Sequence, residues 1–98
     1  MKYKIASISG STRFRDEILK VYNDLTEKGY IVLADLTDHS RQGVFDKEMI
    51  DDMHREKIKM ADLVFVVNPK GYIGESTRNE IKFATQLGKT IEYLDKEN

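Results

Sequence analysis

The sequence predicts an α/β fold built on a small, doubly wound parallel sheet, with four strands in the order 2-1-3-4 and three helices. Two observations lead to this prediction. Short apolar runs rich in β-branched residues alternate with longer segments whose apolar residues recur at helical spacing. Crossovers of this length join parallel strands in a right-handed sense. The 98 residues suffice for a single domain, residues 1–98.

The four predicted strands are short and span residues 2–9, 30–35, 62–68 and 90–94. The third, "DLVFVVN", is the most continuous apolar run, which is typical of a central parallel strand covered on both faces. The order 2-1-3-4 places the switch point of the sheet between the first and third strands, as in flavodoxin-like and Rossmann-like folds.

Three helices are expected between the strands, over residues 13–28, 46–61 and 77–87. Gly29 and Gly88 follow the first and third of them, in the position where glycine commonly ends a helix. In the second helix the charged residues are expected to form mostly a solvated face. Its apolar stripe is expected to contain Met49, Ile50, Met53, Ile58, Met60 and Ala61.

The loops after the first three strands are the expected location of a site. Residues 10–13 and 68–76 contain glycines, and residues 36–45 form a polar loop. Ligands of doubly wound sheets bind beyond the carboxyl ends of the strands at the switch point. We therefore expect the segments "SGSTR" and "GYIGEST" to meet there.

Composition narrows the function classes. The net charge of −1 gives no electrostatic argument for a nucleic-acid binder, and no segment approaches the roughly 18 apolar residues of a membrane span. There is no cysteine, which excludes disulfides and thiolate metal sites, and the two histidines lack the spacing of metal ligands. We expect a cytoplasmic protein that uses no metal or other cofactor and binds neither nucleic acid nor a membrane.

Glu80 is the main anomaly of the third predicted helix. At about 100° per residue it lies within the apolar arc, between Ala84 and Leu87. A carboxylate in that position is costly unless it is paired or lines a cavity. Two interpretations stay open: a capping box in which Glu80 reaches back to the amide of Thr77, and a functional residue in a pocket.

The segment "SGSTRF", residues 9–14, is a second candidate. A glycine after a strand, followed by hydroxyl residues and a helix start, can bind phosphate, and Arg13 adds a positive charge. Most loops of this kind are ordinary tight turns in which a residue such as Ser11 caps the helix. We expect Ser11, Arg13 and Ser76 to surround a phosphate or a similar anion.

Four other polar residues have less specific interpretations. His54 lies on the apolar side of the second predicted helix, where a lone histidine is more often hydrogen-bonded and half-buried than catalytic. Lys57 is expected to extend to solvent. Asp62 opens the third strand and is expected to be structural, whereas Asp35 ends the second strand and is a secondary candidate for the site.

The segments "ISGSTR", "HREKIKMADLVFVVN" and "GESTRNEIKFATQLGKTI" together resemble the nucleoside 2-deoxyribosyltransferase superfamily, including its branch of nucleotide N-glycosidases, the 2′-deoxynucleoside 5′-phosphate N-hydrolases. The resemblance covers nearly the whole chain. Its most specific part runs from Glu80 to Ala84 and continues to Gly88 and Lys89, and it is similar to the "E-[IL]-G-x-A…G-K" helix of that family.

The resemblance implies cleavage or transfer at the N-glycosidic bond of a nucleoside or nucleoside 5′-monophosphate, with Glu80 as the nucleophile at the anomeric carbon. It also implies a homodimer. Its substrate contacts would come from Gly10, Ser11, Arg13, Ser76 and Thr77.

Three positions depart from that family. His54 stands where the family has an aspartate, Ser7 where an aromatic hydroxyl is common, and Lys82 where the family has a glycine. His54 can replace the aspartate as an acid or base, so we count it with Glu80 as a catalytic candidate.

Two other function classes are compatible with the same residues. One is a nucleotide-binding module that keeps the pocket without turnover. The other is an FMN-dependent reductase, because "GSTR" is similar to the phosphate loop of such enzymes, but the chain lacks the aromatic-rich loop after the third strand that holds their flavin. An enzyme that acts on an N-ribosyl bond is the leading hypothesis.

Overall fold

The computed structural model describes residues 2–37 and 45–96. Its elements, including two short 3-10 turns (η), are β1 (Ile5–Gly10), η1 (Thr12–Phe14), α1 (Arg15–Glu27), β2 (Ile31–Leu33), α2 (Lys47–Met60), β3 (Leu63–Val67), η2 (Pro69–Gly71), α3 (Glu75–Gln86) and β4 (Thr90–Tyr93). All strand pairs are parallel and the order is β2-β1-β3-β4, which confirms the predicted topology. Most of the predicted loop 36–45 lies outside the described residues.

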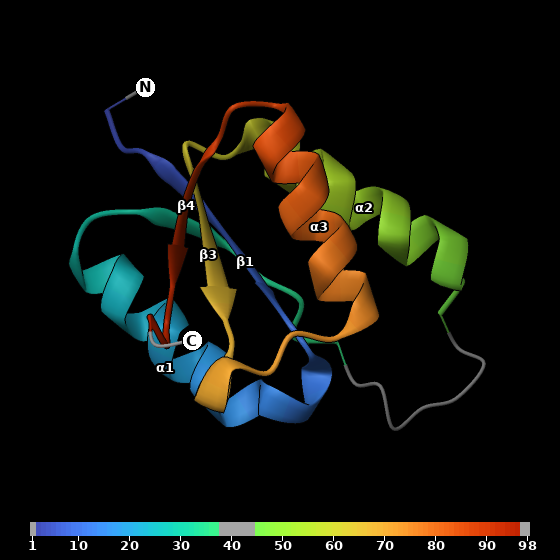
Figure 1. The fold of residues 1–98 in the computed structure, drawn as a ribbon. Helices are drawn as coiled ribbons and strands as arrows, with labels where there is room; N and C mark the ends of the chain where they lie inside the picture. The colour runs from blue at the N-terminus through green and yellow to red at the C-terminus, as the bar shows by residue number, and fades with distance from the viewer. Residues whose placement is uncertain (1, 38–44, 97–98) are drawn as a thin grey trace.

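The sheet lies between two helical layers, with α1 on one face and α2 and α3 on the other (Figure 1). Side chains of β1 alternate between these layers, because successive residues of a strand point to opposite faces. Ala6 and Ile8 pack against α1, whereas Ile5 belongs to the cluster below α2 and α3. Ser7 and Ser9 therefore face the α2–α3 layer, and both are buried.

The helix ends agree with the glycine signals. Gly29 and Gly88 adopt φ angles of 93° and 70°, a region that favours glycine, directly after the C-caps of α1 and α3. At the other end of the sheet, the carboxylate of Asp62 accepts a hydrogen bond from the amide of Ile5 at 2.8 Å, which confirms its structural role. No helix within the described ranges is both long enough and apolar enough to cross a bilayer.

The start of α3 differs from the prediction and removes the capping-box interpretation of Glu80. The helix begins at Glu75, with Gly74 as its N-cap, and the amide of Arg78 donates to the carbonyl of Gly74 at 2.9 Å. Thr77 is therefore a buried residue inside the helix and not its cap. Gly74 is in an extended conformation and serves as the N-cap without a side chain. The helix therefore begins before Thr77, and the Thr-x-x-Glu pattern does not mark its start.

The buried face of α2 also differs from the prediction. Met49, Met53 and Met60 are 47%, 47% and 55% exposed and lie outside the core. Ile50, Ile58 and Ala61 face inward as predicted, and His54 and Lys57 lie on the same side at helical spacing. Lys57 is half-buried, and its Nζ donates to the carbonyl of Ala34 at 3.4 Å. The sequence placed His54 on the correct side, but the few apolar residues of this charged helix did not reveal the centre of its buried arc.

Candidate functional site

The switch point is formed by a close approach of two strand ends. Gly10 ends β1 and pairs with Val67, which ends β3. A methyl group on Gly10 would lie 3.1 Å from both the Cβ and the carbonyl oxygen of Val67, closer than ordinary contacts allow. Glycine at this position therefore lets the two loops that leave the sheet lie side by side.

Those two loops meet as the sequence predicted. The ring of Phe14 packs edge-on against the ring of Tyr72, with 5.6 Å between centroids. Beside them is a hollow of about 480 Å³. Its walls are Gly10, Ser11, Thr12, Asp35, Phe45, Lys47, Ile50, Asp51, His54, Tyr72, Gly74, Glu75, Ser76, Thr77 and Glu80.

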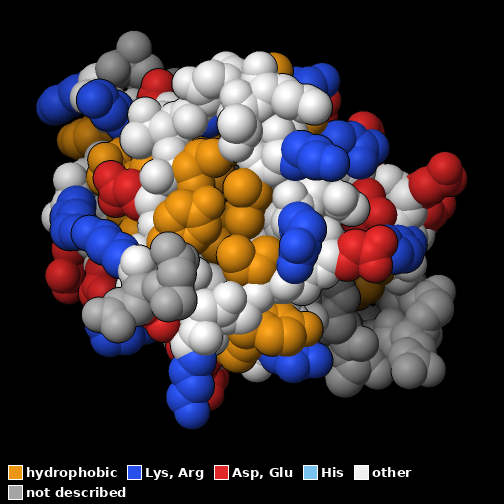
Figure 2. Space-filling view, viewed as in Figure 1, with side chains coloured by type: hydrophobic (Ala, Val, Ile, Leu, Met, Phe, Trp, Pro, Cys, Tyr) orange, Lys and Arg blue, Asp and Glu red, His pale blue; other side chains and the backbone are white. Residues whose placement is uncertain are grey.

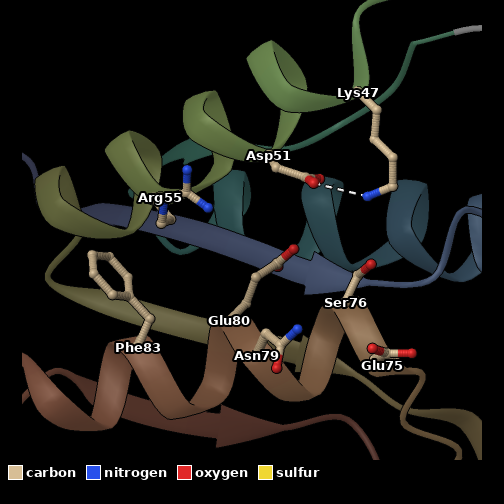
Figure 3. A pocket seen from close by; sticks show the side chains of 8 residues that line it. All are labelled: Lys47, Asp51, Arg55, Glu75, Ser76, Asn79, Glu80 and Phe83. Carbon is tan, nitrogen blue, oxygen red and sulfur yellow. Dashed lines mark hydrogen bonds and ion pairs between the residues drawn. The ribbon is translucent and has the colours of Figure 1, made fainter.

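A second hollow of about 300 Å³ adjoins the first, between α2 and α3. Figure 3 shows its lining residues: Lys47, Asp51, Arg55, Glu75, Ser76, Asn79, Glu80 and Phe83. Glu80 projects from α3 into the space below α2, and Phe83 points from the same helix towards α2 (Figure 3). Glu80 lines both hollows, as do Lys47, Asp51, Glu75 and Ser76.

The environment of Glu80 favours its neutral form. Burial raises the pKa of this carboxyl above its ordinary value, and the negative charges of Asp51 and Asp35 raise it further. The hydroxyl of Ser9 and the charge of His54 act in the opposite direction and lower the pKa. Because the net effect is upward, burial outweighs the stabilising neighbours.

Ser9 is the residue beneath this carboxylate that sequence analysis missed. Its hydroxyl is buried and makes no hydrogen bond of good geometry with any described residue. The Ser9 hydroxyl nevertheless lies close enough to Glu80 to stabilise its charged carboxylate. The distance or angle of this contact is therefore outside the range of a well-formed hydrogen bond. The available signal was strand alternation, which places Ser7 and Ser9 on one face. Ser7 itself pairs with Leu33 and Val64 within the sheet and does not line either hollow.

His54 and Asp35 form a pair on the wall of the larger hollow. Nε2 of His54 lies 3.3 Å from Oδ2 of Asp35. Asp35 also accepts a hydrogen bond from the amide of Thr37 at 3.0 Å. Asp35 follows β2 at the carboxyl edge of the sheet, so topology brings this secondary candidate to the same place as His54 and Glu80.

Lys47 and Asp51 have solvent-exposed side chains, as predicted for a solvated face, and they also line both hollows. Nζ of Lys47 donates to Oδ2 of Asp51 at 2.8 Å. This hydrogen bond, together with the charges of Asp51 and Glu75, raises the pKa of Lys47. The missed signal is spacing: Lys47, Asp51 and His54 are separated by four and three residues, which puts them on one side of a helix.

Not all of the residues expected to contact an anion or substrate line the larger hollow. Ser11, Ser76 and Thr77 line the larger hollow. Arg13 is not among its lining residues, and its guanidinium lies over the ring of Tyr72, 4.6 Å from the centroid. Whether any of these residues contacts a substrate stays a prediction. Across residues 2–37 and 45–96, no cluster of three histidines, aspartates or glutamates is close enough to hold a metal ion.

No protein-family model matches the chain, and a comparison with curated proteins finds no significant match.

Proposed function

We propose that this protein cleaves or transfers at the N-glycosidic bond of a nucleoside or nucleoside 5′-monophosphate, with Glu80 as the nucleophile. One observation carries the proposal: the half-buried Glu80 lines two adjoining hollows. A nucleoside has two parts, sugar and base, joined at a single reactive carbon. A carboxylate between two compartments suits attack at that carbon.

The chemistry follows from this placement. An oxygen of Glu80 forms a bond to the anomeric carbon as the bond from that carbon to the base nitrogen breaks. The electron pair leaves with the base, which takes up a proton, and we assign His54 as the acid. Water or a second base then displaces the carboxylate, and His54 takes the proton released in that step. The transition state carries positive charge on the sugar, which the negative cleft stabilises.

Two features besides Glu80 support a nucleoside as the ligand. Tyr72 lines the larger hollow and Phe83 the smaller one, so each offers an aromatic side chain on which a base can stack. The resemblance of residues 80–89 to the nucleoside 2-deoxyribosyltransferase superfamily is the other support. With no family match, we propose the superfamily and do not assign it.

The alternative function is a nucleotide-binding module without turnover. The observation that favours it is the burial of Glu80, because burial raises the pKa of this carboxyl and so opposes the charged form that a nucleophile needs.

A single experiment separates these functions. The protein is incubated with each common ribo- and deoxyribonucleoside and with each 5′-monophosphate, and free base is measured by chromatography. Binding is measured in parallel from the shift in unfolding temperature. Release of base that Glu80→Gln abolishes and Glu48→Gln leaves intact supports the enzyme, since Glu48 is exposed and lies outside both hollows. Binding without release supports the module.

We also propose that the protein acts as a homodimer. In Figure 2 apolar side chains gather in the centre of the face that β4 and α3 form. Leu87, which follows α3, is 44% exposed, and Ile91 and Tyr93 of β4 are half-buried. A patch of this kind is typical of a contact surface. Light scattering over a range of protein concentrations tests it: a dimer that Leu87→Glu dissociates supports the proposal, and a monomer throughout contradicts it.

A further inference from the structure

The charges around the cleft bear on which substrate it accepts. Four residues with carboxylates line the larger hollow: Asp35, Asp51, Glu75 and Glu80. Among the described residues, Lys47 is the one lysine that lines it, and no arginine does. A nucleoside and its 5′-monophosphate differ by a phosphate group with up to two negative charges. An acidic cleft therefore treats the two molecules differently.

The positive groups beside the cleft already have partners. Lys47 donates to Asp51 at 2.8 Å. The guanidinium of Arg13 lies over the ring of Tyr72, at 4.6 Å from its centroid. A phosphate would therefore compete with Asp51 for Lys47 and with the ring of Tyr72 for Arg13.

One backbone donor of the first loop is also engaged, and the start of α3 carries an acidic residue. The hydroxyl of Ser11 accepts a hydrogen bond from the amide of Arg13 at 3.3 Å, and so caps its own three-residue turn. The amide end of α3 would favour an anion. However, its first residue is Glu75, whose carboxylate supplies the negative charge that this helix end favours.

We propose that the cleft selects a nucleoside without a 5′-phosphate, and that Glu75 and Asp51 are the residues that exclude the phosphorylated form. This inference rests on the proposed function and narrows its substrate class. It departs from the expectation of a phosphate site at Ser11, Arg13 and Ser76.

The test compares each nucleoside with its own 5′-monophosphate, both for base release and for the shift in unfolding temperature, at low ionic strength. For the wild-type protein we expect the nucleoside to be preferred by roughly tenfold or more, as repulsion between nearby charges implies. Added salt should reduce the preference, because it screens charges that face solvent.

Two variants locate the cause. Glu75→Gln removes the charge at the start of α3, and Asp51→Asn releases Lys47 to meet a phosphate. Each substitution should lower the preference for the nucleoside over its monophosphate several-fold. Glu48→Gln is the matched control, because Glu48 is an exposed first-turn glutamate of α2 that does not line either hollow, and it should leave the ratio unchanged.

The outcomes separate this inference from the proposed function. If base is released from the monophosphate as fast as from the nucleoside, or faster, the inference is overturned. The proposed enzymatic function is still supported, because base is released. If no base is released, binding decides: tighter binding of nucleosides supports the inference without the enzyme. Equal or tighter binding of monophosphates overturns it, and so does the absence of any binding.

Discussion

Nε2 of His54 lies 3.3 Å from Oδ2 of Asp35, and the two side chains are only 17% and 14% exposed. His54 comes from α2 and Asp35 follows β2, so the pair joins two elements on the wall of the larger hollow. The carboxylate orients the imidazole, whose charge in turn acts on Glu80. This chain of contacts makes His54 more than an isolated polar residue on an apolar face.

The pair should be energetically coupled. We expect Asp35→Asn and His54→Gln each to lower the free energy of unfolding, and the double variant to lose less than the two single losses together, because the contact can be lost only once. Coupling between contacting polar residues is about 0.5–3 kcal/mol. Urea unfolding of the four proteins measures it. Strictly additive losses would show that the two side chains do not interact.

Glu80→Gln should abolish turnover and stabilise the fold at neutral pH. Loss of the nucleophile should reduce base release by several powers of ten. Because burial raises the pKa of Glu80, its contribution to stability is most favourable below the ordinary value of 4.5 and is lost as the pH rises through the raised pKa. Glutamine resembles the protonated form at every pH.

Urea unfolding at several pH values tests this stability effect. The advantage of Glu80→Gln over the wild type should be present at neutral pH and should vanish below pH 4.5. A variant that is less stable than the wild type at neutral pH would mean that the charged carboxylate is well paired in the fold.

Gly10→Ala should destabilise the protein by about 1–3 kcal/mol, the usual cost of overpacking, and should impair the cleft. The added methyl would lie 3.1 Å from the Cβ and carbonyl of Val67 and would push the two strand ends apart. Gly74→Ala is the matched control, since its methyl would meet only the side chain of Tyr72, at 3.6 Å or more. Chemical denaturation of both variants gives the comparison, and similar losses would contradict the close-approach argument.

Ile58→Ala should cost about 2–5 kcal/mol, as expected for a fully buried aliphatic residue. Ile58 is 1% exposed and belongs to the cluster with Ala61, Val64 and Ala84. Met53→Ala in the same helix should cost well under half as much, because Met53 is 47% exposed. Unfolding by urea compares them directly. Comparable losses would mean that the methionine side of α2 is covered in solution, for example by a second copy.

Local patterns in the sequence determined the topology and the helix ends of this protein. Alternating strand and helix periods fixed the order β2-β1-β3-β4, because parallel strands joined by right-handed crossovers leave few topologies. Gly29 and Gly88 marked two helix ends, since few other residues adopt a positive φ readily. The position of Glu80 in an apolar arc was also visible, because the helical period alone puts it there.

Only the tertiary structure decided what surrounds Glu80. Which arc of α2 is buried depends on how that helix lies over the sheet, and its few apolar residues do not define one narrow arc. The packing turned Asp51 and His54 into the cleft and left Met53 outside. The pKa of Glu80 follows from the same packing, since burial and charges from other elements act through space and leave no trace in the spacing of residues along the chain.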